Sequence, residues 1–123
     1  MNIVLWVIQI LLALAFLMAG STKAFQYEKA KARMKWVNDV PRGLVAFVGG
    51  VEVLGAIGLI LPALTGILPV LTPLAAVGLV IVMVLASGFH ATRGEYQGVV
   101  ANLILFGLSA FVVYGRFVLA PLA

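Results

Sequence analysis

The chain has 123 residues, 64% of them hydrophobic, with no cysteine and a net charge of +4, and its mean hydropathy is +1.22. Apolar residues make up only about half of a soluble domain, so this composition excludes an ordinary soluble protein and predicts an integral membrane protein. The lack of cysteine excludes disulfides, thiolate metal sites and thiol–disulfide chemistry. The basic residues flank apolar runs, which indicates membrane topology and anionic lipid rather than binding to nucleic acid.

Four apolar runs have close to the ~20 residues that a helix needs to cross a bilayer core. They cover approximately residues 3–22, 43–61, 69–89 and 97–115, and Pro62 is expected to end the second. Backbone polar groups inside a bilayer must bond internally, and four short segments cannot close a barrel, so each run is predicted to be helical. The predicted fold is all-α, a four-transmembrane-helix bundle that forms a single membrane domain over residues 1–123.

The strongly polar segment, residues 23–42, separates the first two runs. Its less polar positions recur at helical spacing: Tyr27, Ala30, Met34 and Val37. This pattern predicts a short amphipathic helix at the membrane interface, ended by residues 39–41. A solvated connector with no lipid role fits the same charges equally well. The second polar loop, residues 91–96, is predicted to be a tight turn.

The basic residues also predict an orientation. Seven of them lie in residues 23–42 and at Arg93, whereas Arg116 alone lies on the other side of the predicted spans. Basic loops stay in the cytoplasm, so both polar loops are expected to be cytoplasmic and both termini outside, in a bacterial cytoplasmic membrane. A cysteine at the N-terminus that is labelled only after the cytoplasm is opened would overturn this topology.

Each run has one face that mixes small and polar residues, as helices that pack together in a membrane do. In the second run this face consists of Val45, Gly49, Glu52, Ala56 and Leu59. The corresponding faces are Gln9, Ala13, Phe16, Gly20 and Lys23 in the first run, Ala76, Met83, Ser87 and His90 in the third, and Gly98, Asn102, Phe106 and Ser109 in the fourth. We expect these faces to meet in the middle of the bundle.

Glu52 is the one acid inside an apolar run. A charged side chain at the centre of a membrane helix costs roughly 2.5–3.5 kcal/mol on insertion scales. Glu52 follows Arg42 by ten positions, which places it ~15 Å below the membrane boundary at ~1.5 Å per residue. We therefore expect it to be either protonated and neutral or paired with a cation. Its helical phase turns it toward Gln9, Ser87 and Asn102.

The predicted ligand-binding residues are Lys23, Glu52, His90 and Asn102, with Glu52 also a candidate proton relay. Lys23 and His90 lie at the same end of their helices and are expected to close a pocket over Glu52. Each residue also has a purely structural interpretation. Lys23 can anchor its helix at the interface, His90 can cap a helix, and Glu52 and Asn102 can hydrogen-bond between helices. One histidine without cysteine or clustered acids predicts no metal site.

Three stretches, in their order and spacing, resemble the DoxX-like family: Gly20-Ser21-Thr22-Lys23, Glu52 to Pro62, and Met83-Val84-Leu85-Ala86 followed by His90. Val53 departs from the leucine that the family usually has there, and the fourth run carries no matching motif. The resemblance implies a small four-helix membrane protein and marks Lys23, Glu52 and His90 as candidate functional positions. Some relatives belong to quinone-linked or membrane-associated oxidoreductase complexes, and a distant animal relative is a membrane chaperone for receptor assembly.

Three functions fit these observations. The first is a redox-associated accessory subunit that binds a quinone or similar lipid-like ligand in the bundle. A redox partner protein would supply electrons, because the chain lacks the ligands for an iron–sulfur cluster or an obvious haem. The second is a non-enzymatic assembly or chaperone-type interaction protein. The third, a small proton-coupled transporter, ranks last because Glu52 is in the second run and the charge bias fixes one orientation. The glycines leave the oligomeric state open, including a homo-oligomer.

Overall fold

A computed structural model describes residues 1–121 of the chain, and these residues fold entirely into helices and connecting turns. The elements are α1 (Asn2–Phe25), α2 (Tyr27–Arg33), the 3₁₀ turn η1 (Lys35–Asp39), α3 (Arg42–Thr65), α4 (Leu71–Thr92), α5 (Tyr96–Tyr114) and the π-helical turn η2 (Gly115–Leu119). Within this part of the chain, α1, α3, α4 and the continuous segment Tyr96–Leu119 are long and apolar enough to cross a membrane. The predicted all-α fold with four apolar helices is confirmed.

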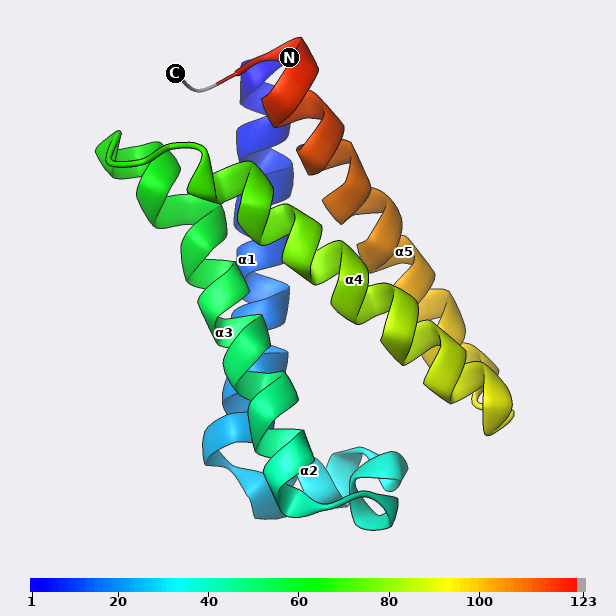
Figure 1. The fold of residues 1–123 in the computed structure, drawn as a ribbon. Helices are drawn as coiled ribbons and strands as arrows, with labels where there is room; N and C mark the ends of the chain where they lie inside the picture. The colour runs from blue at the N-terminus through cyan, green and yellow to red at the C-terminus, as the bar shows by residue number, and fades with distance from the viewer. Residues whose placement is uncertain (122–123) are drawn as a thin grey trace.

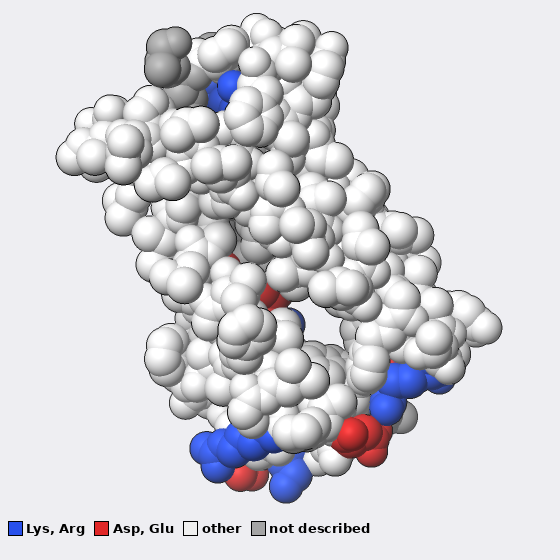
Figure 2. Space-filling view, in the orientation of Figure 1, with Lys and Arg blue, Asp and Glu red and all other residues white. Residues whose placement is uncertain are grey.

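The four long helices form two pairs (Figure 1). α1 packs along α3, α4 packs along α5, and α4 joins the pairs by crossing α3. The two pairs lie close together near the chain termini and diverge toward the other end, where α2 and η1 lie across the base of the α1–α3 pair. Charged side chains gather at this second end, which we call the charged end (Figure 2). The arrangement leaves a wedge between the pairs.

The inward faces follow from the distribution of small and polar residues. All five residues expected on the inner face of α3 are buried. Gln9, Ala13, Phe16 and Gly20 are buried on α1 as expected. Of the residues expected on the inner faces of α4 and α5, three are buried: Ala76, Met83 and Ser109. The others are half-buried: Ser87, His90, Gly98, Asn102 and Phe106. The helical phases were therefore predicted well, because small and polar residues share the packed face of a membrane helix.

Two glycines set the spacing between α1 and α3. A Cβ atom placed on Gly49 would lie only 2.6 Å from the carbonyl oxygen of Gly20 and 2.7 Å from the backbone nitrogen of Ala24. The reciprocal Cβ on Gly20 would lie 2.7 Å from the carbonyl oxygen of Gly49. Only glycine allows two helix backbones to approach this closely. The contact fixes the position of α1 along α3, one turn from Lys23 on the first helix and from Glu52 on the second.

Pro62 does not end the second span, contrary to expectation. α3 continues to Thr65 and ends at Gly66, whose backbone is left-handed (φ 72°). A proline inside a helix has no N–H to bond the carbonyl oxygen four residues earlier, which here belongs to Gly58. The hydroxyl of Thr72 on α4 donates to that oxygen at 2.9 Å. A side chain of the neighbouring helix thus satisfies the carbonyl that proline leaves free.

The polar segment also differs from the single short helix that was predicted. α2 ends at Met34, whose backbone is extended, and the chain continues as η1. The predicted hydrophobic face nevertheless survives, because Ala30 and Val37 are buried together with Val45 of α3. The bend at Met34 lets the chain follow the end of the α1–α3 pair and carries Trp36 toward the wedge between the helix pairs.

Candidate functional site

A cavity of about 400 Å³ occupies the wedge in the half of the bundle nearest the charged end. Its walls come from α1, η1, α3, α4 and α5, and most of its lining is apolar. This volume is within the range of known ligand pockets, which are typically apolar with a few polar groups. All four residues predicted to bind a ligand line it: Lys23, Glu52, His90 and Asn102. The structure brings them together, while their roles in binding stay predictions.

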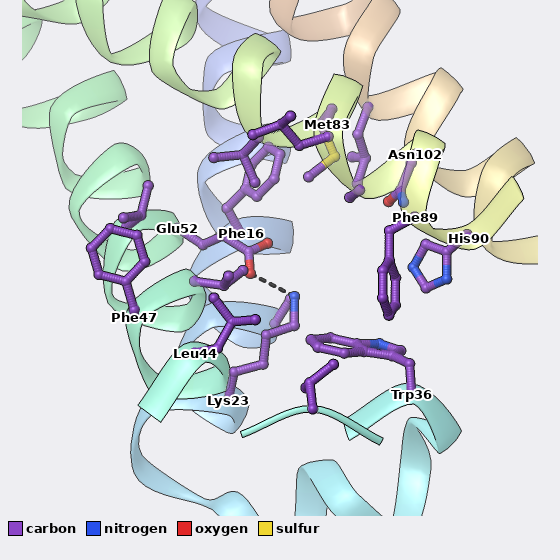
Figure 3. A pocket seen from close by; sticks show the side chains of 18 of the residues that line it. Phe16, Lys23, Trp36, Leu44, Phe47, Glu52, Met83, Phe89, His90 and Asn102 are labelled. Atoms are coloured by element: carbon purple, nitrogen blue, oxygen red, sulfur yellow. Dashed lines mark hydrogen bonds and ion pairs between the residues drawn. The ribbon is translucent and has the colours of Figure 1, made fainter. Parts of the chain in front are cut away.

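Lys23 and Glu52 form an ion pair on the α1–α3 side of the pocket (Figure 3). Nζ of Lys23 donates to Oε1 of Glu52 at 2.5 Å, and the two side chains are only 12% and 3% exposed. Glu52 was expected to be either protonated or paired with a cation, and in the structure it is paired with Lys23. An ammonium group has three N–H donors, so Lys23 retains further donors beyond this bond. The pair places both an acid and a hydrogen-bond donor at the pocket wall.

Asn102 faces the pocket from α5, on the side opposite the ion pair (Figure 3). Its side-chain nitrogen is buried and has no hydrogen-bond partner among the described residues. An unpaired buried polar group costs about 1–3 kcal/mol, so such groups in native proteins usually have a partner such as a water or a ligand. Ser87 was also expected to face Glu52. Its hydroxyl is buried and has no hydrogen-bond partner among the described residues, but Ser87 does not line the pocket.

Three aromatic rings close the pocket toward the charged end (Figure 3). Trp36 of η1 lies edge to face with Phe89 and with His90 of α4, at centroid distances of 5.9 and 6.3 Å. Nζ of Lys23 lies 5.7 Å from the centre of the Trp36 ring, which adds a cation–π attraction to the ion pair. The three rings stand nearly at right angles to one another, and together they form an apolar wall that offers both ring faces and ring edges to a ligand.

A polar network joins the two helix pairs outside this aromatic wall. Nδ1 of His90 lies 3.0 Å from Oε1 of Glu95 in the turn between α4 and α5. Arg93 of the same turn donates from Nε to Glu95 at 2.9 Å and from Nη2 to Asp39 of η1 at 2.6 Å. The hydrogen bond with His90 is the largest cause that lowers the pKa of Glu95, and Arg93 lowers it further. The network holds η1 against the α4–α5 turn.

The carboxyl group of Glu95 is expected to titrate below its ordinary value of 4.5, because its ionised form accepts these hydrogen bonds. A depressed pKa stabilises the folded state above the ordinary value, and this stabilisation is lost as the pH falls through the depressed value. NMR titration of isotope-labelled glutamate carboxyls measures this pKa, and His90→Phe is expected to raise it toward the ordinary value. An unchanged titration in that variant would show that His90 does not hold the carboxylate.

Gln9 lies away from Glu52, so that part of the expectation was wrong. Its side-chain nitrogen donates to the carbonyl oxygen of Leu59 at 2.7 Å, and its oxygen accepts from Nε of Arg116 at 2.6 Å. Arg116 also donates from Nη1 to Asn2 and to the carbonyl oxygen of Ala120, and it is only 3% exposed. Gln9 therefore contacts α3 at Leu59, two turns along that helix from Glu52, and stabilises a buried arginine near the chain termini.

Sequence reasoning missed two contributors to the pocket wall. These are Trp36 and Phe89, neither of which was among the residues predicted to bind a ligand. Their placement depends on the bend at Met34 and on the angle between the helix pairs. The spacing of residues in the sequence predicts neither of these. The burial of Arg116 among polar partners could have been predicted, because a lone charge in an apolar segment requires partners just as Glu52 does.

Residues 7–112 match the family model described as the DoxX-like family. This match covers most of the chain and includes every residue that lines the pocket. No curated protein and no solved structure gave a match. The family match and the four apolar helices together indicate an integral membrane protein.

Proposed function

Because this chain belongs to the DoxX-like family and brings Lys23, Glu52, His90 and Asn102 together in one apolar pocket, we propose that it is a redox-associated membrane subunit that binds a quinone. The observation that carries the proposal is the pair of hydrogen-bond donors on opposite walls. Lys23 lies on one wall and the unpartnered amide nitrogen of Asn102 on the other. The head group of a quinone is a planar ring with a carbonyl acceptor at each end.

The pocket residues fit this head group in three respects. Lys23 and Asn102 donate to its two carbonyl oxygens, and the wall formed by Trp36 and Phe89 packs against its ring. Glu52 exchanges a proton with Lys23 across their hydrogen bond. A bound quinone would carry two electrons and two protons between its oxidised and reduced forms. Both electrons come from a partner redox protein and both protons come ultimately from water, one of them through Lys23 and Glu52 to the carbonyl oxygen that Lys23 bonds.

The distribution of charge supports a docking position for the partner at the charged end. In the proposed orientation the charged end of the bundle faces the cytoplasm, because Lys and Arg residues are concentrated there. The aromatic wall and the polar network outside it close the pocket toward this end, and a cytoplasmic or membrane-bound electron donor would dock against them. Trp36 and Phe89 then separate the donor from the ligand.

The proposal is tested by extracting quinones from gently purified protein and identifying them by mass spectrometry. Asn102→Leu removes one hydrogen bond to the ligand and is expected to lower quinone retention roughly tenfold, since such a bond contributes about 1–1.5 kcal/mol. Gln97→Leu is the matched control, because it makes the same kind of change at an exposed position of α5 that is not part of the pocket lining. Glu52→Gln is expected to lower the activity of any coupled redox reaction.

Two results would contradict quinone binding. The first is purified protein that retains no quinone from membranes that contain it. The second is equal retention by Asn102→Leu and Gln97→Leu. If a defined partner complex co-purifies under these conditions and tolerates Glu52→Gln, the assembly function replaces the redox function.

A further inference from the structure

The pocket opens through the side of the bundle. On the face drawn in Figure 2, the surface is hollowed between α3 and α4, and acidic and basic atoms are visible in its depth. Glu52 and Lys23 are the acidic and basic residues that line the pocket. The hollow lies between the long apolar helices, at the height at which their side surfaces would face lipid.

The rim of this hollow is apolar and exposed. Phe47 on α3 and Leu85 on α4 both line the pocket, and they are 68% and 69% exposed. Leu44 lines the same side of α3 and is exposed as well. In a helix that spans a membrane, exposed apolar side chains contact acyl chains. The pocket wall is therefore continuous with the lipid-facing surface of the protein.

Entry of a ligand from the charged end is obstructed, in contrast to entry through the side opening. Trp36 packs against Phe89 there, and the Asp39–Arg93 ion pair joins η1 to the α4–α5 turn at 2.6 Å. A ligand that entered from this end would have to separate both contacts. It would also pass through an interface rich in lysine and arginine.

We propose that the ligand enters and leaves sideways from the bilayer, with a polar head at the Lys23–Glu52 pair and a long hydrocarbon chain that passes between Phe47 and Leu85 into the lipid. The occupant is thus a membrane-borne amphiphile and not a water-soluble molecule. Moving a hydrocarbon chain into contact with water is unfavourable for every CH₂ group, so a side entrance avoids the cost of drawing the chain through the polar end. The inference rests on the proposed function for the identity of the head group.

Photo-cross-linking of the full-length protein in vesicles tests the route with two quinone analogues. One analogue carries its photoreactive group on the ring and the other on the hydrocarbon chain. The ring probe is expected to label the pocket interior around Trp36 and Met83. The chain probe is expected to label the peptides that contain Phe47 and Leu85. An excess of unlabelled long-chain quinone should suppress both reactions.

The outcomes separate the two proposals. If the ring probe labels the pocket and the chain probe labels residues 26–41, the side entrance is wrong while quinone binding stands. If neither probe gives labelling that the competitor suppresses, quinone binding fails and the side entrance fails with it.

A substitution in the opening provides a second measurement. Ala86 of α4 lines the pocket next to Leu85, so Ala86→Trp would narrow the opening. It is expected to slow the uptake of a long-chain quinone from vesicles at least tenfold. Ala101→Trp adds the same ring at an exposed position of α5 that is not part of the pocket lining and is expected to leave uptake unchanged. Equal uptake by the two folded variants would contradict the proposed entrance, and if Ala86→Trp does not fold, the cross-linking decides.

Discussion

Replacing Lys23 by methionine is expected to lower the free energy of unfolding by about 3–5 kcal/mol, the cost of removing one partner from a buried ion pair. Glu52 is 3% exposed and accepts a hydrogen bond from Lys23 at 2.5 Å, so the variant would leave its carboxylate in an apolar wall without a cation. Unfolding in mixed micelles, followed by circular dichroism as the denaturing detergent is increased, measures the change.

Two further variants separate the loss of the ion pair from other effects. Lys29→Met makes the same change at an exposed position of α2 and is expected to be neutral within about 0.5 kcal/mol. The double variant Lys23→Met with Glu52→Gln removes both charges and is expected to be more stable than Lys23→Met alone, because no unpaired charge is left buried. If the double variant is less stable than the single one, the cost of Lys23→Met does not come from an unpaired carboxylate.

Gly49→Ala is expected to destabilise the protein by about 3 kcal/mol, at the upper end of the usual cost of overpacking. The new methyl group would meet the Gly20 carbonyl oxygen at 2.6 Å and the Ala24 nitrogen at 2.7 Å. These are backbone atoms that cannot rotate away, so α1 and α3 would have to move apart. The methyl group would also lie 2.7 Å from Cβ of Lys23, which disturbs the ion pair in addition. The same unfolding titration reports the loss.

Gly50→Ala is the matched control one position later in α3. A Cβ atom there meets nothing within 4 Å. Alanine is favoured over glycine in a helix by about 1 kcal/mol, so this variant is expected to be neutral or slightly stabilised. In a Gly49→Ala background, Lys23→Met should lower the free energy of unfolding by less than it does in the unmodified protein. The reason is that the effects of substitutions at residues in contact do not add. Equal stability of the two alanine variants would show that the helices do not meet at Gly49.

The inward faces could be predicted from the sequence because each depends on one helix alone. The 3.6-residue period of the helix puts Glu52, Gly49 and Ala56 on one face. A glutamate is costly in contact with lipid, so this face must point into the bundle. The same argument brought Lys23, His90 and Asn102 to one pocket. Helical phase fixes the direction of a side chain, and length along the helix fixes its depth, so the direction and depth of these residues could be predicted from each helix alone.

The features that could not be predicted all depend on a partner elsewhere in the chain. Pro62 stays inside α3 because Thr72 of another helix bonds the carbonyl oxygen of Gly58. Gln9 shares a face with residues that line the pocket, yet Arg116 binds it more than a hundred positions away in the sequence. The divergence of the helix pairs, which creates the pocket, has no counterpart in the spacing of residues.

The order of the two helix pairs along the chain also determines how the protein can be inserted into a membrane. α1 and α3 precede α4 in the chain, and together they already contain both the close approach of Gly20 to Gly49 and the Lys23–Glu52 ion pair. A charged residue is costly in a bilayer until it is paired, so α3 inserts most favourably beside an α1 that has already presented Lys23. We expect the α4–α5 hairpin to dock afterwards as a second unit. The pocket is complete only after this step, because α4 and α5 supply part of its wall.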